Sequence, residues 1–176
     1  MQRDKRLLLI FIITTTFQFA IALYLIIDSE LVLSNGQEIK LRLKPVDPID
    51  IFRGHYFQLN IESAVKIENI DNWKVGDKCF AIFDEDSLGF YKLKSISELE
   101  PSKNKVYLSS KIMWIIQSDS MATLQLPINK FYIEESKAKQ LESEISGIPS
   151  DSLKAYIITN YNNGKITVKD LIINKL

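Results

Sequence analysis

The chain opens with a long apolar run and continues with short alternations of apolar and polar residues. The run from Leu7 to Ile27 contains 21 residues and no charge. As an α-helix it is about 31 Å long, close to the roughly 30 Å hydrocarbon core of a bilayer. The pattern therefore predicts a transmembrane helix at residues 7–27.

Beyond this run, the pattern predicts a mainly β domain over residues 28–176. In Gln37 to Leu43 the apolar residues alternate, which places Ile39, Leu41 and Leu43 on one face of a half-buried strand. Seven further runs lie between turn residues, and we expect about nine strands in all. These runs are His55 to Glu62, Lys78 to Phe83, Gly89 to Ile96, Lys105 to Gln117, Pro127 to Ile133, Lys154 to Tyr161 and Lys165 to Ile173.

Two local signals complete the predicted fold. Ser136 to Ile145 has the apolar spacing of a short amphipathic helix, and Gly147 and Pro149 follow it in the usual order of a helix stop. The turn Asn163-Gly164 between the last two strands predicts a hairpin, because both residues tolerate positive φ. The predicted fold class is mainly β with one short helix, forming an antiparallel barrel-like or two-part β domain after an N-terminal transmembrane helix.

The charges around the span predict its direction. Three cations lie in residues 1–6, whereas Asp28 and Glu30 follow the span. Since Lys and Arg favour the cytoplasmic side, residues 1–6 are expected inside and residues 28–176 outside. The alternative is a cleaved signal peptide with its site at Ala20-Ile21-Ala22, but the apolar run continues beyond that point to Ile27. We therefore expect an uncleaved single-pass anchor.

Composition excludes several classes of function. The 22 cations and 22 anions cancel, and no basic block marks a nucleic-acid surface. A single cysteine, Cys79, excludes an intrachain disulfide framework and a multi-cysteine metal site. A single histidine, His55, excludes the His-rich zinc sites. We expect no metal, no cofactor and no nucleic-acid partner.

One segment carries a family resemblance. Residues 45–61 read PVDPIDIFRGHYFQLNI and resemble the GDYXXLXY family of bacterial membrane-anchored proteins. The motif falls on Gly54, His55, Tyr56, Leu59 and Ile61, and two positions depart from it. His55 stands where the family has Asp, and Ile61 stands where it has Tyr.

Other segments extend the resemblance over essentially the whole chain. Asp47-Pro48 and Phe52-Arg53 are similar to the approach to the motif, Val75-Gly76-Asp77 to a second Gly-Asp turn, and Asn129 to Glu135 to a conserved aromatic segment. The family has no assigned activity and is often encoded beside multi-spanning membrane proteins. The resemblance implies a single-pass protein of the bacterial cytoplasmic (inner) membrane, with its domain on the periplasmic or outer side and a multi-spanning membrane protein as its partner.

The candidate site is the motif loop together with a later segment. Arg53 is expected to pair with Asp47 and Asp50 through its planar fork, which favours a structural role for the loop. The alternative is a binding loop whose polar residues converge at one mouth of the domain. The candidate binding residues are Asp47, Asp50, Arg53, Gly54, His55, Tyr56, Tyr132 and Glu134.

Enzymatic alternatives remain open. An anchored outer β domain with Cys79 and His55 is similar to sortases, but Cys79 lies within an apolar strand, where cysteine usually acts as a small core residue. The turn Ser118 to Met121 contains a Ser-Met pair similar to that of signal peptidases. The acids Asp84 to Asp86 lack the spacing of a calcium loop. The first hypothesis is therefore a non-enzymatic accessory or binding protein, and the alternative is a Ser- or Cys-type hydrolase or transpeptidase acting on peptide or cell-wall material.

Overall fold

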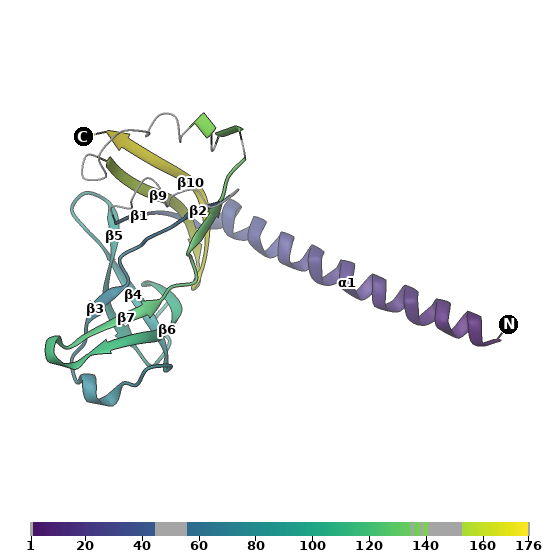
Figure 1. Ribbon diagram of the computed structural model, residues 1–176, viewed down its shortest axis with the longest axis horizontal. Helices are drawn as coiled ribbons and strands as arrows, with labels where there is room; N and C mark the ends of the chain where they lie inside the picture. Colours follow the sequence, from purple (N-terminus) through teal and green to yellow (C-terminus); the bar gives the residue numbers. More distant parts are fainter. Residues whose placement is uncertain (1, 45–55, 135, 138, 141–152, 176) are drawn as a thin grey trace.

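The fold consists of one projecting helix and a mainly β body (Figure 1). The computed structural model describes residues 2–44, 56–134, 136–137, 139–140 and 153–175. The predicted helix from Ser136 to Ile145 therefore lies largely outside the described residues.

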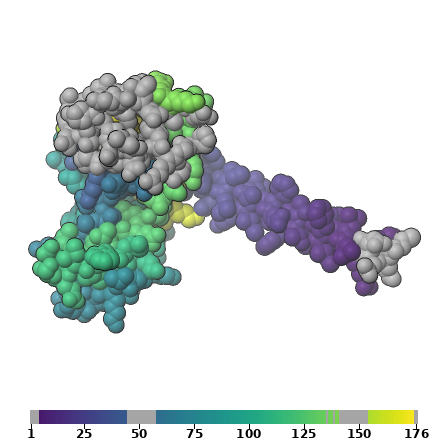
Figure 2. All heavy atoms as spheres, viewed as in Figure 1, coloured from purple at the N-terminus to yellow at the C-terminus, as the bar shows by residue number. Residues whose placement is uncertain are grey.

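The single long helix, α1, spans Gln2–Asn35 and has 34 residues. At 1.5 Å per residue it is about 51 Å long, which exceeds the thickness of a hydrocarbon core. Its large apolar side chains between Leu7 and Ile27 are 47–72% exposed, and α1 stands clear of the β body (Figure 2). By length and composition, α1 is apolar enough to cross a membrane.

Eight strands form the main sheet, and two short strands form a separate pair. The main sheet has the order β10-β9-β1-β5-β4-β6-β7-β3, and its neighbours are antiparallel except for β1 and β5. Its strands are β1 (Gln37–Arg42), β3 (Ala64–Lys66), β4 (Lys78–Glu85), β5 (Phe90–Ser97), β6 (Val106–Ile116), β7 (Met121–Gln125), β9 (Leu153–Asn162) and β10 (Lys165–Lys175). The pair consists of β2 (Tyr56–Gln58) and β8 (Lys130–Tyr132). Two 3₁₀ turns are η1 (Ile70–Asn72) and η2 (Gln117–Asp119).

The sheet is open, so the barrel-like alternative is not confirmed. Its edge strand β3 comes back against β5 across the curled sheet, but no pairing of these strands is described. The reason is that both edges of β5 are already occupied, one by β4 and the other by β1. A strand has only two hydrogen-bonding edges, and therefore β3 cannot close the ladder.

The alternating pattern predicted the core-facing residues of β1 correctly. Ile39, Leu41 and Leu43 are all at most 8% exposed. The predicted hairpin is also confirmed, because Asn163 and Gly164 have φ of 45° and 81° between β9 and β10. By contrast, the predicted strand His55 to Glu62 is reduced to the short β2 and an isolated bridge at Ile61.

The end of α1 is built into the β body. Val32 is 4% exposed, and the carbonyl of Leu33 accepts a hydrogen bond from the Asn160 side chain of β9. Lys165, the first residue of β10, forms an ion pair with Asp28 of α1, and Asp28 raises the pKa of this lysine. The helix therefore passes from its exposed apolar part into the domain without a flexible link.

Candidate functional site

The predicted motif loop is described only at its end. Tyr56 in β2 lies directly opposite Tyr132 in β8, so the fold brings these two candidates together. Tyr132 is 72% exposed, and exposed Glu134 accepts a 2.7 Å hydrogen bond from the Ser136 hydroxyl. The candidates outside the described residues are Asp47, Asp50, Arg53, Gly54 and His55.

The second half of the motif is structural. Leu59 and Ile61 are 5% and 7% exposed and belong to the hydrophobic core. The Leu59 amide donates a 3.0 Å hydrogen bond to the Asn129 carbonyl, and Ile61 pairs with Leu43 at the end of β1. These residues therefore tie the segment after the motif loop to the two sheets.

The thiol of Cys79 has the environment of a core residue. Cys79 lies in β4 and is 2% exposed. Burial, together with the nearby negative charge of Asp77, raises its pKa to about 11. A nucleophilic cysteine needs the opposite shift, toward the thiolate at neutral pH.

Two serines, Ser110 and Ser118, form hydrogen bonds within their own strand or turn. The Ser118 hydroxyl donates a 3.1 Å hydrogen bond to the Asp119 carboxylate in η2. The buried Ser110 hydroxyl donates to the Leu108 carbonyl at 3.3 Å. The Ser110 contact is to a backbone carbonyl, which cannot act as a general base, and the Ser118 contact is to the adjacent residue of an exposed turn.

A well-ordered turn joins β4 and β5 and was not predicted as part of the site. One oxygen of Asp86, Oδ1, accepts hydrogen bonds from the amides of Leu88 (2.9 Å) and Phe90 (3.0 Å). Gly89 has φ of 79°, a conformation that glycine adopts without a steric cost. The turn therefore has one defined shape, and it leaves Leu88 71% exposed at its tip.

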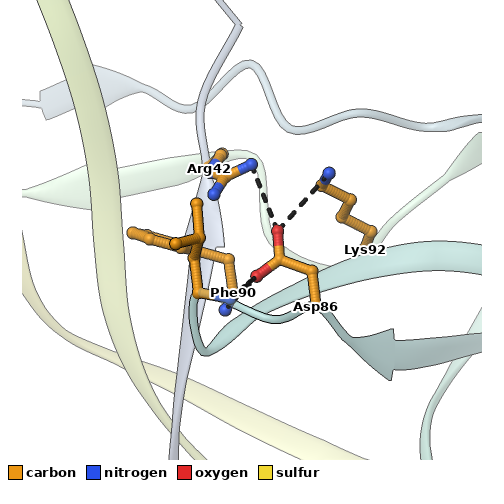
Figure 3. Close-up of polar contacts among 5 residues, drawn as sticks. Arg42, Asp86, Phe90 and Lys92 are labelled. Carbon is orange, nitrogen blue, oxygen red and sulfur yellow. Dashed lines mark hydrogen bonds and ion pairs between the residues drawn. The ribbon is translucent and has the colours of Figure 1, made fainter.

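The other oxygen of Asp86, Oδ2, forms ion pairs with two cations (Figure 3). Asp86 Oδ2 lies 3.2 Å from Arg42 Nη1 and 3.4 Å from Lys92 Nζ. The Arg42 guanidinium also stacks 4.3 Å from the centroid of the Phe90 ring. The amide of Phe90, then that of Leu88, then Lys92 and Arg42 hold the pKa of Asp86 below its usual range, despite some desolvation.

Arg42, Leu88 and Phe90 line a cavity of about 560 Å³, which we call the distal pocket. Phe90 and Tyr156 pack edge to face in its wall, with ring centroids 5.3 Å apart. The pocket is lined by Arg42, Leu43, Leu88, Phe90, Lys154, Ala155, Tyr156 and Asn174. Since β1 begins beside α1 and runs away from it to Arg42, the pocket lies at the end of the sheet remote from the helix (Figure 1).

Among the described residues, those at the distal pocket carry more positive than negative charge. Arg42 and Lys154 line it and Lys92 lies beside it, whereas Asp86 is the carboxylate that holds two of these cations. Lys154 is exposed, and no ion pair joins it to another residue in the part of the chain that the structure describes. The arrangement suits an anionic group attached to an apolar body.

A second hollow, of about 440 Å³, contains one of the predicted residues. Tyr132 lines it together with other residues of 127–132 and with Ile166, Thr167 and Val168 of β10. The two hollows lie near different ends of β10, because Asn174 belongs to the distal pocket. Across the described ranges, no three His, Cys, Asp or Glu residues are grouped as metal ligands would be.

Comparison with known proteins gives one family. The model of the GDYXXLXY protein family matches residues 18–171. The match begins within the apolar part of α1 and ends in β10, and so it includes the junction between helix and sheet. No curated protein and no solved structure matches the chain.

Proposed function

The chain belongs to the GDYXXLXY family, and we propose that it is a membrane-anchored accessory domain. In this role the domain stands on the outer face of the bacterial cytoplasmic membrane and binds a multi-spanning membrane protein. No cofactor takes part.

The observation that carries the proposal is the junction of α1 with the sheet. The large apolar side chains of this helix are 47–72% exposed. Such a surface is unfavourable in water, so lipid or other helices are expected to cover it. The same helix continues to Asn35, where Val32 and Gly36 pack against β9. A domain fixed in this way is held close to the bilayer, where a partner embedded in the membrane is within reach.

The proposed direction rests on charge. The cations at Arg3, Lys5 and Arg6 precede the span, and Asp28 and Glu30 follow it. This asymmetry favours a cytoplasmic N-terminus. Asp28 also has a partner on the domain side in Lys165, so the first charge after the span belongs to the folded domain.

The proposed role is binding, not catalysis. Burial of Cys79 and its raised pKa argue against a thiolate nucleophile. Ser110 is buried and donates to a backbone carbonyl, and Ser118 donates to its neighbour in the sequence, so both serines have a local structural role. Both findings support an accessory role over a hydrolase or transpeptidase.

Two measurements on the full chain in cells test this proposal. The protein should resist carbonate extraction, and protease added to intact spheroplasts should digest the β domain. A cytoplasmic protein must survive the same treatment as a control. Protection of the domain from protease would refute the topology, and extraction by carbonate would refute the anchor.

The partner requires a separate experiment. A photo-crosslinking amino acid at Tyr132, which is 72% exposed, should join the domain to a multi-spanning membrane protein that mass spectrometry identifies. The same amino acid at exposed Ser109, on another strand, serves as the matched control. Crosslinks confined to soluble proteins would contradict the proposed partner class.

A further inference from the structure

We propose that the distal pocket binds an amphipathic carboxylate: a carboxylate group adjacent to an apolar side chain, as at the C-terminus of a peptide. This inference deepens the proposed binding role, but it does not depend on the anchor or its direction. It rests on the turn, the cavity and the charges described for the end of β1.

The size and lining of the pocket favour a small ligand with an apolar part. A volume of about 560 Å³ falls within the range of roughly 300–1,000 Å³ that is typical of ligand pockets. Phe90 and Tyr156 supply aromatic surface, and Leu88 supplies an apolar rim. Leu88 is 71% exposed although the turn around it is held by two hydrogen bonds to Asp86. Leu88 is therefore an exposed apolar side chain on a turn of fixed shape, and it can contact a ligand in the pocket.

The charges favour an anion. Arg42 binds Asp86 through Nη1, and its guanidinium has further N–H donors in the same plane. The Phe90 ring supports the guanidinium face at 4.3 Å, so the direction of these donors is fixed before a ligand arrives. Lys154 also lines the pocket, and it is an exposed residue. A carboxylate between Arg42 and Lys154 would receive hydrogen bonds from both.

The single negative charge of Asp86 does not neutralise the cations at the pocket. Asp86 is the one carboxylate that contacts Arg42 and Lys92 among the described residues, so one negative charge faces these two cations. Lys154 adds a third positive charge to the same region. A ligand with one carboxylate reduces this excess, whereas a neutral or cationic ligand does not.

Calorimetry on the full chain in nanodiscs of zwitterionic lipid tests the proposal. The probes are N-acetyl-phenylalanine, its amide, and an acetylated Ala-Ala-Phe tripeptide with a free C-terminus, each corrected for binding to empty nanodiscs. Both acids should bind about tenfold more tightly than the amide, because hydrogen bonds to charged groups are the stronger ones. Tighter binding of the tripeptide would identify a polypeptide as the source of the carboxylate, and equal binding would identify a free acid.

Variants separate the two parts of the site. Lys154→Gln and Arg42→Gln should each weaken binding of the acids about tenfold and leave the amide unchanged. Leu88→Ser should weaken acid and amide alike. Lys94→Gln is the matched control, since Lys94 lies on β5 near Lys92 but pairs with Asp84 outside the pocket.

The outcomes are decisive even if one variant is unstable. Arg42 contacts Asp86 and Phe90, so Arg42→Gln requires a thermal melt beside its binding curve. Lys154 is exposed and has no ion-pair partner in the described part of the chain, so Lys154→Gln remains interpretable if Arg42→Gln misfolds. Equal affinity for acid and amide, no binding of either acid, or an unchanged affinity in Lys154→Gln would each overturn the proposal.

Discussion

Gly36 follows the end of α1 and lies against β9, so a small change at this position affects both the helix end and the junction. A Cβ atom at Gly36 would lie 2.4 Å from the Val32 carbonyl oxygen, 3.0 Å from the Tyr161 carbonyl oxygen and 3.1 Å from Asn160 Cβ. The first two are backbone atoms, and the Val32 carbonyl also accepts a 2.9 Å hydrogen bond from the Gly36 amide. Gly36→Ala must therefore move the end of the helix, β9 or both.

The expected cost follows from two opposing effects. Forcing an extra methyl group into a packed site typically costs about 1–3 kcal/mol, and a collision with backbone lies at the upper end of this range. Replacing glycine by alanine also restricts the unfolded chain, which stabilises the fold by about 0.4–1 kcal/mol. The steric effect is the larger, so Gly36→Ala should lower the free energy of unfolding by about 2 kcal/mol, or roughly 30-fold in the unfolding constant.

Urea unfolding of the full chain in nanodiscs measures this effect. Trp73 and Trp114 both belong to the β part, so their fluorescence reports on the domain and not on the span. Asn35→Ala is the matched control, because Asn35 is the exposed neighbour at the end of α1 and should change stability by less than about 0.5 kcal/mol. Equal stability of Gly36→Ala and the parent would show that helix and sheet do not meet as described.

Three further predictions concern the motif, the turn and the thiol. Leu59→Ala should destabilise the domain by about 2–5 kcal/mol in urea unfolding, because Leu59 is 5% exposed in the core, whereas exposed Asn60→Ala should not. The pKa of Asp86 is lowered in the folded protein, so its carboxylate stabilises the fold at pH values above the usual aspartate pKa of about 4. This contribution is lost as the pH falls through the lowered pKa. The stability difference between parent and Asp86→Asn should therefore disappear in acid, and a constant difference would contradict the ion-pair network. Cys79, with its pKa raised to about 11, should resist iodoacetamide at pH 8 until urea is added, and rapid labelling of the folded protein would contradict its burial.

Strong local patterns predicted the elements that packing later confirmed. The alternation in Gln37 to Leu43 gave the buried face of β1, because a strand places every second side chain on the same side. The turn at Asn163-Gly164 gave the β9–β10 hairpin, because the φ values that it requires are those of Asn and Gly. In both cases the determining interactions lie within a few residues of one another.

Weaker patterns led to the missed strands. β3 has only three residues, Ala64–Lys66, and acquires its strand character by pairing with β7. β7 does alternate, with Ala122 and Leu124 buried, but small and polar residues between them give little apolar contrast. Neither strand is defined without its neighbour, and so the sequence pattern predicted no strand at either place.

The distal pocket was missed for a related reason. In the sequence, Asp86 is one of three adjacent acids that lack the spacing of a calcium loop, and nothing in its own segment indicates Arg42, which lies 44 positions earlier. The two meet because β1 pairs in parallel with β5, which places the end of β1 beside the β4–β5 turn. The one available signal was Asp86 three residues before Gly89, a spacing typical of a turn in which the carboxylate accepts backbone hydrogen bonds.

The same parallel pairing links the open sheet to the candidate site. By occupying the free edge of β5, β1 prevents closure by β3 and also carries Arg42 to the turn at Asp86. β1 also pairs with β9, which pairs with β10. At one end, these two strands contribute Tyr156 and Asn174 to the pocket. At the other end, Asn160 and Lys165 contact the helix. These three strands therefore connect α1 at one end with the distal pocket at the other.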